Sequence, residues 1–249
     1  MIFVGSNSLV RSDYHAIGRE LSGLAVRLGG LRPDDAVLEV GSGTGRMAVA
    51  LTAVLSPQGR FEGFGIVREG VAWCQAHLTP RFPRFRFQHA DIFNSFYCPG
   101  GRGTAAAFRF PFDDESFDFV LATSVLTHMY RAEAAHYLSE IARVLRPRGR
   151  TFITHFLLTP ESRIAVEAER SALRFAHPVP DGLTTDPSQP EAAIAIDVDA
   201  VNADYAAAGL VVADSTYPGT WSGRPSGVTF QDIVVSVRRP EPLGRPRSG

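Results

Sequence analysis

The stretch VLEVGSGTGR, from Val37 to Arg46, decides the fold of this chain. A short apolar run enters a Gly-x-Gly-x-Gly turn, and the residues after it, RMAVALTAVL, have the apolar spacing of a helix. Glycine lets a backbone approach a ligand where a Cβ would clash, and the N–H groups at the start of a helix are free to donate. The stretch therefore predicts a buried strand, a ligand-binding turn and a helix. A tight turn without a ligand is the alternative interpretation.

Strand and helix patterns alternate along most of the chain. Strands are predicted at residues 36–40, 60–66, 85–91, 117–125, 151–158, 210–217 and 230–239. The helices predicted between them include an amphipathic one over residues 132–150, which Pro147 and Gly149 close. Such alternation implies a parallel sheet covered on both faces. A loop without a helix joins the last two strands, so they are expected to form an antiparallel hairpin.

Three segments lie outside this alternation. Residues 10–34 are expected to form an N-terminal helical cap. Residues 160–195, which hold a short helix and the Pro-rich stretch FAHPVPDGLTTDPSQPE, are interpreted as an insertion over the site. The tail, residues 241–249, is expected to be disordered. Residues 1–240 then make up one domain.

The composition excludes several classes of protein. With 249 residues, 45% of them hydrophobic, the chain has the size of one α/β domain with an insertion. A net charge of −1 argues against a nucleic-acid scaffold. All 25 basic residues are arginine, which excludes lysine Schiff-base chemistry and the phosphate-binding P-loop. Cys74 and Cys98 suit a reduced compartment, and neither a signal peptide nor a bilayer-spanning apolar run is present, so a cytoplasmic location without membrane attachment is expected.

The segment RFPRFRF, residues 81–87, allows two interpretations. Arginine mixed with phenylalanine is typical of some RNA-binding surfaces. Phe85 and Phe87 alternate with arginines, however, as in a strand with one buried face. We favour the buried aromatic face and expect no nucleic-acid partner.

VLEVGSGTGR resembles the first motif of the class I S-adenosylmethionine-dependent methyltransferases. HADIF, SFDFVLATSVLTHM and YLSEIARVLRPRGRTFIT are similar to later motifs of this family and follow in the same order. The resemblance covers residues 14–160 and 195–240. It implies an α/β fold, a Rossmann-like seven-stranded sheet with an antiparallel last strand and helices on both faces. It also implies S-adenosylmethionine as the cofactor.

The resemblance carries roles over to individual positions. It implies that Glu39 orients the methionine amino group and that the glycines let the backbone pass close to the cofactor. Asp91 would accept a hydrogen bond from the adenine amine, with the Ile92 N–H pairing to the ring. The cofactor-binding residues expected in this way are Glu39, Gly41, Gly43, Gly45, Gly65, Ile66, Asp91, Ile92, Thr123 and Ser124.

One position departs from the family pattern. The family's second strand ends in an acidic residue that binds both ribose hydroxyls, but Gly65 stands at that place here. Each lost charged hydrogen bond costs ~1.5–3 kcal/mol. Glu69, a water or backbone groups near Ile66 are the candidate replacements. Whether cofactor binding is weakened or abolished stays open at this point.

The missing acid supports two alternative functions. An NADPH-dependent reductase accepts the 2′-phosphate where the acid is absent and an arginine is near, and Arg68 is in range. The Gly-x-Gly-x-Gly spacing, Asp91 and the terminal hairpin favour the methyltransferase instead. The other alternative is a methyltransferase fold that binds without transferring methyl or that catalyses a different reaction.

Histidines are the candidate catalytic residues. Methyl transfer depends mainly on proximity, and a hydroxyl acceptor also benefits from a general base, most often histidine. His155 ends the fifth predicted strand and His128 follows the fourth, both at the carboxyl edge where α/β proteins bind ligands. We predict both as catalytic, with a structural histidine as the alternative for each. Because both face this edge, oxygen is the favoured acceptor atom.

Other residues are candidates for substrate contact. Tyr14 lies in the N-terminal helix, which often covers the cofactor in the resembled family, and Trp221 and Arg224 lie in the loop of the last hairpin. The insertion and this aromatic loop suggest a bulky small molecule, such as a natural-product scaffold or a sugar. No His, Cys or Asp cluster has the spacing of metal ligands, so no metal is expected. A monomer and a homodimer are both compatible with the sequence.

Overall fold

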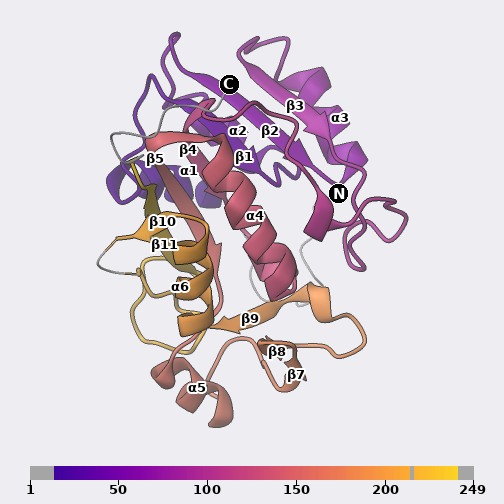
Figure 1. The fold of residues 1–249 in the computed structure, drawn as a ribbon, viewed down its shortest axis with the longest axis vertical. Coiled ribbons are helices and arrows are strands. Elements are labelled where there is room, and N and C mark those ends of the chain that lie inside the picture. Colours follow the sequence, from indigo (N-terminus) through magenta and orange to yellow (C-terminus); the bar gives the residue numbers. More distant parts are fainter. Residues whose placement is uncertain (1–13, 214–215, 241–249) are drawn as a thin grey trace, which may run out of the picture.

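The protein is represented by a computed structural model that describes residues 14–213 and 216–240. Its centre is one seven-stranded sheet in the order β10-β11-β5-β4-β1-β2-β3 (Figure 1). The strands are β1 (Ala36–Val40), β2 (Arg60–Gly65), β3 (Phe85–His89), β4 (Phe117–Ala122), β5 (Leu145–His155), β10 (Leu210–Val212) and β11 (Asp232–Arg238). Only the pairings of β11, with β5 and β10, are antiparallel in this sheet. The expected reversed last strand is thereby confirmed.

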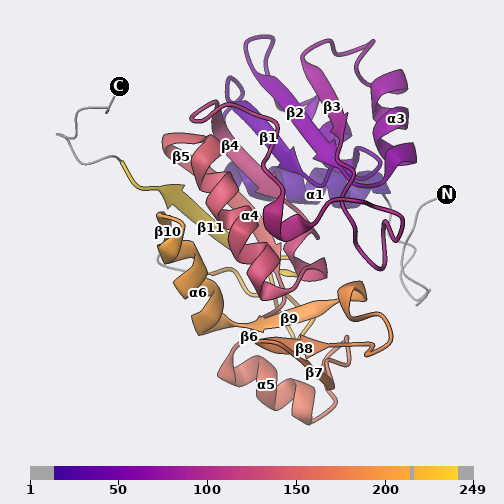
Figure 2. The same cartoon turned by 45° about the vertical axis from the view of Figure 1, so that its right-hand side comes forward.

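Helices cover both faces of the sheet, as expected. The helices are α1 (Tyr14–Arg27), α2 (Arg46–Leu51), α3 (Arg68–His77), α4 (Arg131–Val144) and α6 (Val198–Ala207). Apolar residues of α1, α2 and α3 share one buried cluster with the sheet, and those of α4 and α6 share another. Figure 2 shows α4 and α6 in front of the sheet and α1 behind it. All five residues of β1 are buried, because this strand is covered on both sides.

The boundary between α4 and β5 differs from the sequence prediction. The helix ends at Val144 rather than near residue 150, and Leu145 is already extended, with φ −71° and ψ 139°. Pro147 lacks the N–H that a helix needs and disfavours a helical Arg146 before it. The strand therefore begins six residues earlier than the predicted start, Thr151.

A second, four-stranded sheet was not predicted. It has the order β6-β9-β8-β7, and β7, β8 and the start of β9 come from the segment expected to be an insertion. Its elements are β6 (Leu157–Leu158), β7 (His177–Val179), β8 (Gly182–Thr184) and β9 (Ile194–Asp197), with α5 (Pro160–Glu167) and the 3₁₀ turn η3 (Pro190–Ala192) beside them. The predicted short helix is present as α5. Pro180-Asp181-Gly182 carries a hairpin signal, since Asp181 has a positive φ of 60°.

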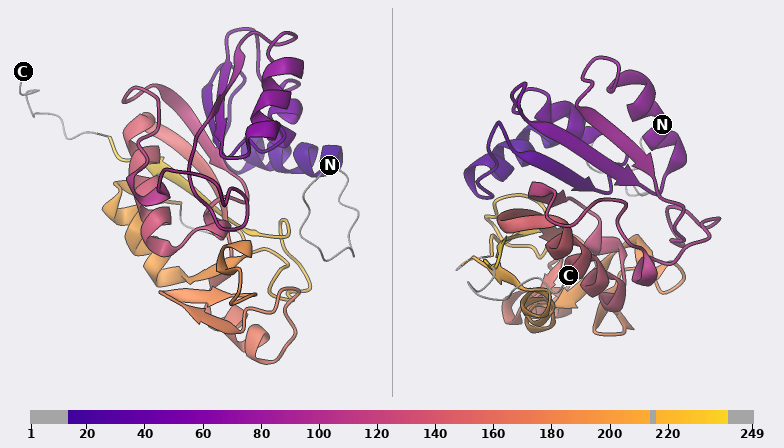
Figure 3. Two further views of the ribbon diagram at one scale, coloured as in Figure 1. Left: turned by 90° about the vertical axis from the view of Figure 1, so that its right-hand side faces the viewer. Right: turned by 45° about the horizontal axis from the view of Figure 1, so that its top comes forward.

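The second sheet stands at the carboxyl end of β5 (Figure 3). One residue, Phe156, separates β5 from β6, and β9 leads directly into α6. A small separate core joins it to the loop before β11; this core contains Phe156, Leu158, Phe175, Ala193, Ala195 and Trp221. Ligands of α/β folds bind at the carboxyl edge of the sheet, near the point where the strand order reverses. Here that point lies between β1 and β4, and the second sheet borders the same edge.

The aromatic segment before β3 has one buried face. Phe85 and Phe87 are each 5% exposed, and the ring of Phe85 stacks on Phe61 with centroids 5.0 Å apart. Arg84 and Arg86 point outward. The alternation predicted from the sequence is confirmed, and these two rings are not available for stacking on bases.

Candidate functional site

The glycine turn joins β1 to α2 through three left-handed residues. Gly41, Gly43 and Gly45 have φ values of 76°, 52° and 82°, a region that side chains disfavour. A Cβ on Gly41 would overlap Val125, and one on Gly45 would lie 2.8 Å from the sulfur of Cys74. A Cβ on Gly43 would meet nothing within 4 Å. The outer glycines are therefore needed for packing, whereas the middle one leaves its backbone open to a ligand.

Backbone hydrogen bonds fix the turn to β2. The N–H groups of Gly41 and Ser42 donate to the carbonyl of Phe64 at 2.9 and 2.8 Å. Within the described residues, the N–H groups of Gly43 and Thr44 have no protein acceptor. These two amides are the donors that the turn can offer to a ligand.

Glu39 supplies a buried carboxylate next to the turn. Its side chain is 2% exposed, and its Oε2 atom has no hydrogen-bond partner among the described residues. Burial raises the pKa of Glu39 to about 8, with Arg46 acting in the opposite direction. A buried acceptor without a partner is costly. It fits a ligand that brings N–H donors, such as the ammonium of an amino acid.

Gly65 ends β2 beside the same turn. An added Cβ there would have ordinary contacts, 3.6 Å from the Gly43 nitrogen and 3.5 Å from Val71 Cγ2. The backbone thus does not require glycine, and the absence of an acid is a change in chemistry rather than a steric necessity. Glu69, the charged candidate replacement for the acid, and Arg68, the arginine on which the NADPH alternative depends, are both exposed in the first turn of α3.

The groups expected to contact adenine have protein partners. Asp91 Oδ2 accepts from Arg102 Nε at 2.6 Å, and this bond lowers the pKa of Asp91. The Ile92 N–H donates to the carbonyl of Ala90 at 3.0 Å. Both residues follow β3 at the carboxyl edge, so their position agrees with the expected role. Arg102 binds Oδ2 of Asp91, whose Oδ1 has no hydrogen-bond partner among the described residues, so the adenine contact of Asp91 stays a prediction.

The end of β4 packs onto the glycine turn through Val125. Just before it, Ser124 has a positive φ of 57°. Its N–H donates to Thr154 Oγ1 at 2.8 Å, and its hydroxyl donates to Gln231 Oε1 at 2.9 Å. Thr123 is buried beside it. The structure therefore brings these two predicted residues next to the turn, and it also uses Ser124 to tie β4 to β5 and the loop before β11.

His155 is enclosed rather than open to a ligand. It ends β5 with 5% exposure, and its Nε2 lies 3.0 Å from the hydroxyl of Tyr205 on α6. Burial lowers the pKa of His155 to about 4. Direct contact with a substrate requires Tyr205 to move. The catalytic role of His155 stays a prediction.

His128 lies in a polar network that includes three residues not singled out from the sequence. It ends the 3₁₀ turn η2 (Leu126–His128), and its ring contacts the Glu191 carbonyl and the hydroxyl of Tyr97. Asn94 donates to both the His128 carbonyl and the Glu191 carboxylate. Burial lowers the pKa of His128, with the Glu191 carbonyl acting in the opposite direction. No local motif marks Asn94, Tyr97 or Glu191, because only the fold brings them together.

The three predicted substrate residues separate into two places. The Tyr14 hydroxyl donates to the Thr44 carbonyl at 2.8 Å, so Tyr14 lies against the glycine turn. Trp221 is fully buried in the small core of the second sheet, where its Nε1 donates to Asp232 at 2.7 Å. Arg224 lies 3.7 Å from Glu161 of α5. Trp221 thus supports the second sheet, and no contact with a substrate has been tested for any of the three.

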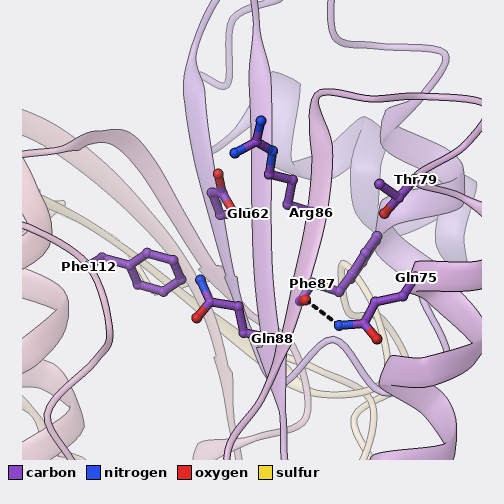
Figure 4. A pocket seen from close by; sticks show the side chains of 7 residues that line it. All are labelled: Glu62, Gln75, Thr79, Arg86, Phe87, Gln88 and Phe112. Carbon is purple, nitrogen blue, oxygen red and sulfur yellow. Dashed lines mark hydrogen bonds between the residues drawn. The ribbon is translucent and has the colours of Figure 1, made fainter.

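A cavity of about 430 Å³ lies away from these residues. Figure 4 shows its lining on both sides of the edge strand β3, and Gln75 on α3 donates to the Phe87 carbonyl there at 2.8 Å. None of the predicted site residues lines it. Among the described residues, no group of three His, Cys, Asp or Glu side chains is placed to hold a metal ion. No helix in the described part of the chain is long and apolar enough to cross a bilayer.

Known proteins resemble this chain in sequence and in fold. The family model for a methyltransferase domain matches residues 38–153. Phthiotriol/phenolphthiotriol dimycocerosates methyltransferase 1 of Mycobacterium ulcerans (strain Agy99) is 34% identical over 129 residues, which are 52% of this chain and 40% of the relative. For 27-O-demethylrifamycin SV methyltransferase of Amycolatopsis mediterranei (strain S699), the identity is 31% over 146 residues, 58% of this chain and 46% of the relative. The chain thus spans less than half the length of these relatives.

The fold also matches solved structures. An S-adenosylmethionine-dependent methyltransferase from Methanosarcina mazei superimposes with a TM-score of 0.59 at 17% identity, covering 85% of this chain and 95% of that one. This likeness concerns the fold alone, whereas the family match falls on the glycine turn and the strands around it. The comparisons therefore confirm the resemblance seen in the sequence: residues 38–153 match a methyltransferase domain, and the chain has the fold of the class I S-adenosylmethionine-dependent methyltransferases.

Proposed function

We propose that this protein binds S-adenosylmethionine at the glycine turn and transfers its methyl group to a hydroxyl of a bulky small molecule, such as a natural-product scaffold or a sugar. The observation that carries the proposal is the pairing of an open Gly43 with the unpartnered carboxylate oxygen of Glu39. An ammonium and a carboxylate on one ligand match this combination of acceptor and backbone donors.

The residues at the turn fit the amino-acid end of the cofactor better than its ribose. Glu39 would accept from the methionine ammonium, and the Gly43 and Thr44 amides would donate to its carboxylate. At the ribose, Gly65 offers no side chain. Asp91 would accept from the adenine amine through Oδ1, since Arg102 binds Oδ2. The bound cofactor would supply an electrophilic methyl group on a sulfonium.

Hydroxyl methylation is supported by the relatives and by the histidines. One relative is named for 27-O-demethylrifamycin SV, a substrate that lacks a methyl group on an oxygen. At the carboxyl edge, burial lowers the pKa of His128 and of His155, so both rings are neutral near pH 7 and each has the lone pair that a general base needs. The second sheet borders this edge and would provide the wall for a bulky acceptor.

Parallel calorimetric titrations test the cofactor. We expect S-adenosylmethionine and S-adenosylhomocysteine to bind and NADPH not to bind. Binding of NADPH alone would support the reductase instead. A failure of all three to bind would favour a methyltransferase fold that no longer binds the cofactor. Gly65, which lacks the acid that binds the ribose, is the observation that supports this alternative.

The two histidines test the acceptor chemistry. We expect His128→Ala or His155→Ala, or both, to lose turnover at least about 100-fold while keeping cofactor affinity, because a general base contributes roughly that much to proton transfer. The measurement is release of S-adenosylhomocysteine with the first alcohol or phenol found to be methylated. Full turnover in both variants would remove the general-base proposal.

A further inference from the structure

The polar network around His128 has a defined direction of hydrogen bonding. Nδ1 of His128 lies 3.0 Å from the main-chain carbonyl of Glu191, and Nε2 lies 3.3 Å from the Tyr97 hydroxyl. A carbonyl can only accept, so Nδ1 must carry the proton. In a neutral ring, Nε2 then has a free lone pair and can only accept. The Tyr97 hydroxyl therefore donates to His128, and its own lone pairs stay available.

Two buried side chains hold this pair in place. The Asn94 side chain is 7% exposed; its amide donates to the His128 carbonyl at 3.1 Å, and its oxygen accepts from the Tyr97 N–H at 2.8 Å. Glu191 is 6% exposed and accepts from Asn94 at 2.8 Å and from the Ser95 N–H at 2.7 Å. The carboxylate thus fixes Asn94, and Asn94 fixes the backbones of both ring residues.

The network joins three parts of the chain at the carboxyl edge. Asn94 and Tyr97 belong to the segment after β3, His128 to the turn after β4, and Glu191 to η3 before β9 of the second sheet. Burial raises the pKa of Tyr97, and Arg46, at the start of α2, acts in the opposite direction. The Tyr97 ring also packs edge-on against His128, with centroids 5.0 Å apart.

We propose that Tyr97 is the residue that takes the proton from the acceptor hydroxyl, with His128 as the final base and with Glu191 and Asn94 as positioning residues. The inference rests on the proposed function and specifies how its acceptor is deprotonated. His128 then does not touch the acceptor itself, because Tyr97 occupies its only accepting nitrogen.

Two proton transfers through these residues accompany the methyl transfer. The acceptor oxygen forms a bond to the methyl carbon while the carbon–sulfur bond breaks, and that electron pair stays on sulfur. The acceptor proton passes to Tyr97, and the Tyr97 proton passes to His128 Nε2. The positive charge of the sulfonium thus ends on the imidazole. Burial lowers the pKa of His128, and the buried Glu191 carboxylate acts in the opposite direction, so this carboxylate favours the charged ring.

Nitrogen NMR of histidine-labelled protein tests the network without any substrate. Long-range proton–nitrogen correlations distinguish the two tautomers of each ring, and His128→Gln assigns the signal. We expect His128 to carry its proton on Nδ1. His77, whose Nδ1 lies 2.9 Å from the Trp73 carbonyl, should have the same form, and His136, whose Nε2 lies 2.9 Å from the Phe108 carbonyl, the opposite one. A proton on Nε2 of His128 would overturn the proposal.

Substitution of the phenol tests the relay. In Tyr97→Phe we expect the Nε2 signal of His128 to shift to that of an unbonded acceptor and kcat to fall about 100-fold or more, with cofactor affinity unchanged. Tyr137→Phe is the matched control, because that ring packs edge-on against Phe110 in the core, with centroids 5.0 Å apart. Unchanged or increased kcat in Tyr97→Phe would show that the phenol merely caps the histidine, and would end the proposal.

The positioning role has its own readout. Glu191→Gln keeps the side-chain shape but turns one acceptor into a donor that faces Asn94 or Ser95. We expect a lower kcat with an unchanged KM for S-adenosylmethionine, together with a weaker Tyr97–His128 hydrogen bond in the nitrogen spectrum. Equal losses in kcat and cofactor affinity would point to a general structural role. If no alcohol or phenol is methylated, the proposed function fails, and the tautomer of His128 still decides the network separately.

Discussion

Two residues beside the glycine turn, Glu39 and Gly65, differ in what they offer to a ligand. Glu39 is a carboxyl group kept out of water with one oxygen unsatisfied, and Gly65 is a position where an added Cβ would have ordinary contacts but no side chain is present. The first was predicted from its place in the motif. Its raised pKa could not be predicted, because it depends on complete burial beneath α1 and the turn.

A carboxylate at position 65 should strengthen cofactor binding. Gly65→Asp places an acceptor at the end of β2, and one charged hydrogen bond to a ribose hydroxyl contributes ~1.5–3 kcal/mol. We therefore expect Kd for S-adenosylhomocysteine to fall at least about 10-fold in calorimetry. Gly100→Asp, at an open loop position with nothing within 4 Å of an added Cβ, is the charge-matched control. A weaker affinity in Gly65→Asp would show that this strand end does not face the ribose.

Glu39 should make stability fall as pH rises. The folded protein keeps the proton of Glu39 up to about pH 8, whereas the unfolded chain releases it near the ordinary value of 4.5. Unfolding thus releases a proton between these values, and the free energy of unfolding falls by up to about 1.4 kcal/mol per pH unit. We expect Glu39→Gln to lack this contribution when urea unfolding is measured at pH 5, 6, 7 and 8. Contributions of other groups, such as His155, cancel in the comparison, and equal slopes would contradict the prediction.

At the scale of elements, apolar periodicity predicted the strands of the main sheet. It did not predict the end of α4 or the short strands of the second sheet. The buried strands and the amphipathic helices follow from apolar spacing. The end of α4 was placed too late because the amphipathic pattern continues toward Pro147, although that residue prevents a helix from continuing. The short strands β7 and β8 have three residues each, too few for a periodic signal.

Asp232 holds the loop before β11 to β6. Its carboxylate accepts from the N–H groups of Gly219 and Leu157, both at 2.8 Å, and from the indole of Trp221. Asp232→Ala leaves three buried donors without an acceptor, so we expect a loss of at least about 3 kcal/mol in urea unfolding. Asp232→Asn keeps one oxygen and should lose less, and the exposed Asp113→Ala should lose nothing measurable. Similar stability for Asp232→Ala and Asp113→Ala would refute the bracing role.

At the scale of the whole molecule, the sequence predicted that the glycine turn stands at the carboxyl edge of the sheet, but not which residues surround it. The order of strands follows from the family motifs, and it places the glycine turn at the point where that order reverses. The contact between Asn94 and Glu191 joins residues 97 positions apart. No local pattern encodes such a contact, so the network around His128 appears only in the folded structure.

Arg131 ties the second sheet to the main body. Its guanidinium binds Asp204 of α6 through two bonds of 2.9 Å and lies 3.3 Å from Asp181, in the β7–β8 turn. We expect Arg131→Met to speed amide exchange in residues 177–184, measured by mass spectrometry, while β4 and β5 stay protected. The global free energy of unfolding should change by less than about 1 kcal/mol.

The control for that variant is Arg174→Met. Arg174 pairs with Glu169 at 2.9 Å, but both side chains are largely exposed, so exchange should not change. Equal exchange in residues 177–184 of the wild type and Arg131→Met would mean that the small core alone fastens the second sheet.

The parallel pairing of β6 with β9 has a consequence for engineering. It sets Leu157, where the chain leaves β5, beside Ile196, two residues before α6 begins. The two junctions of this block are thus neighbours, and a foreign block of different length can be spliced between them while the seven central strands keep their positions. We expect such chimaeras to bind S-adenosylmethionine as tightly as the parent protein while binding different acceptor molecules. Cofactor affinity and acceptor specificity could then be changed independently.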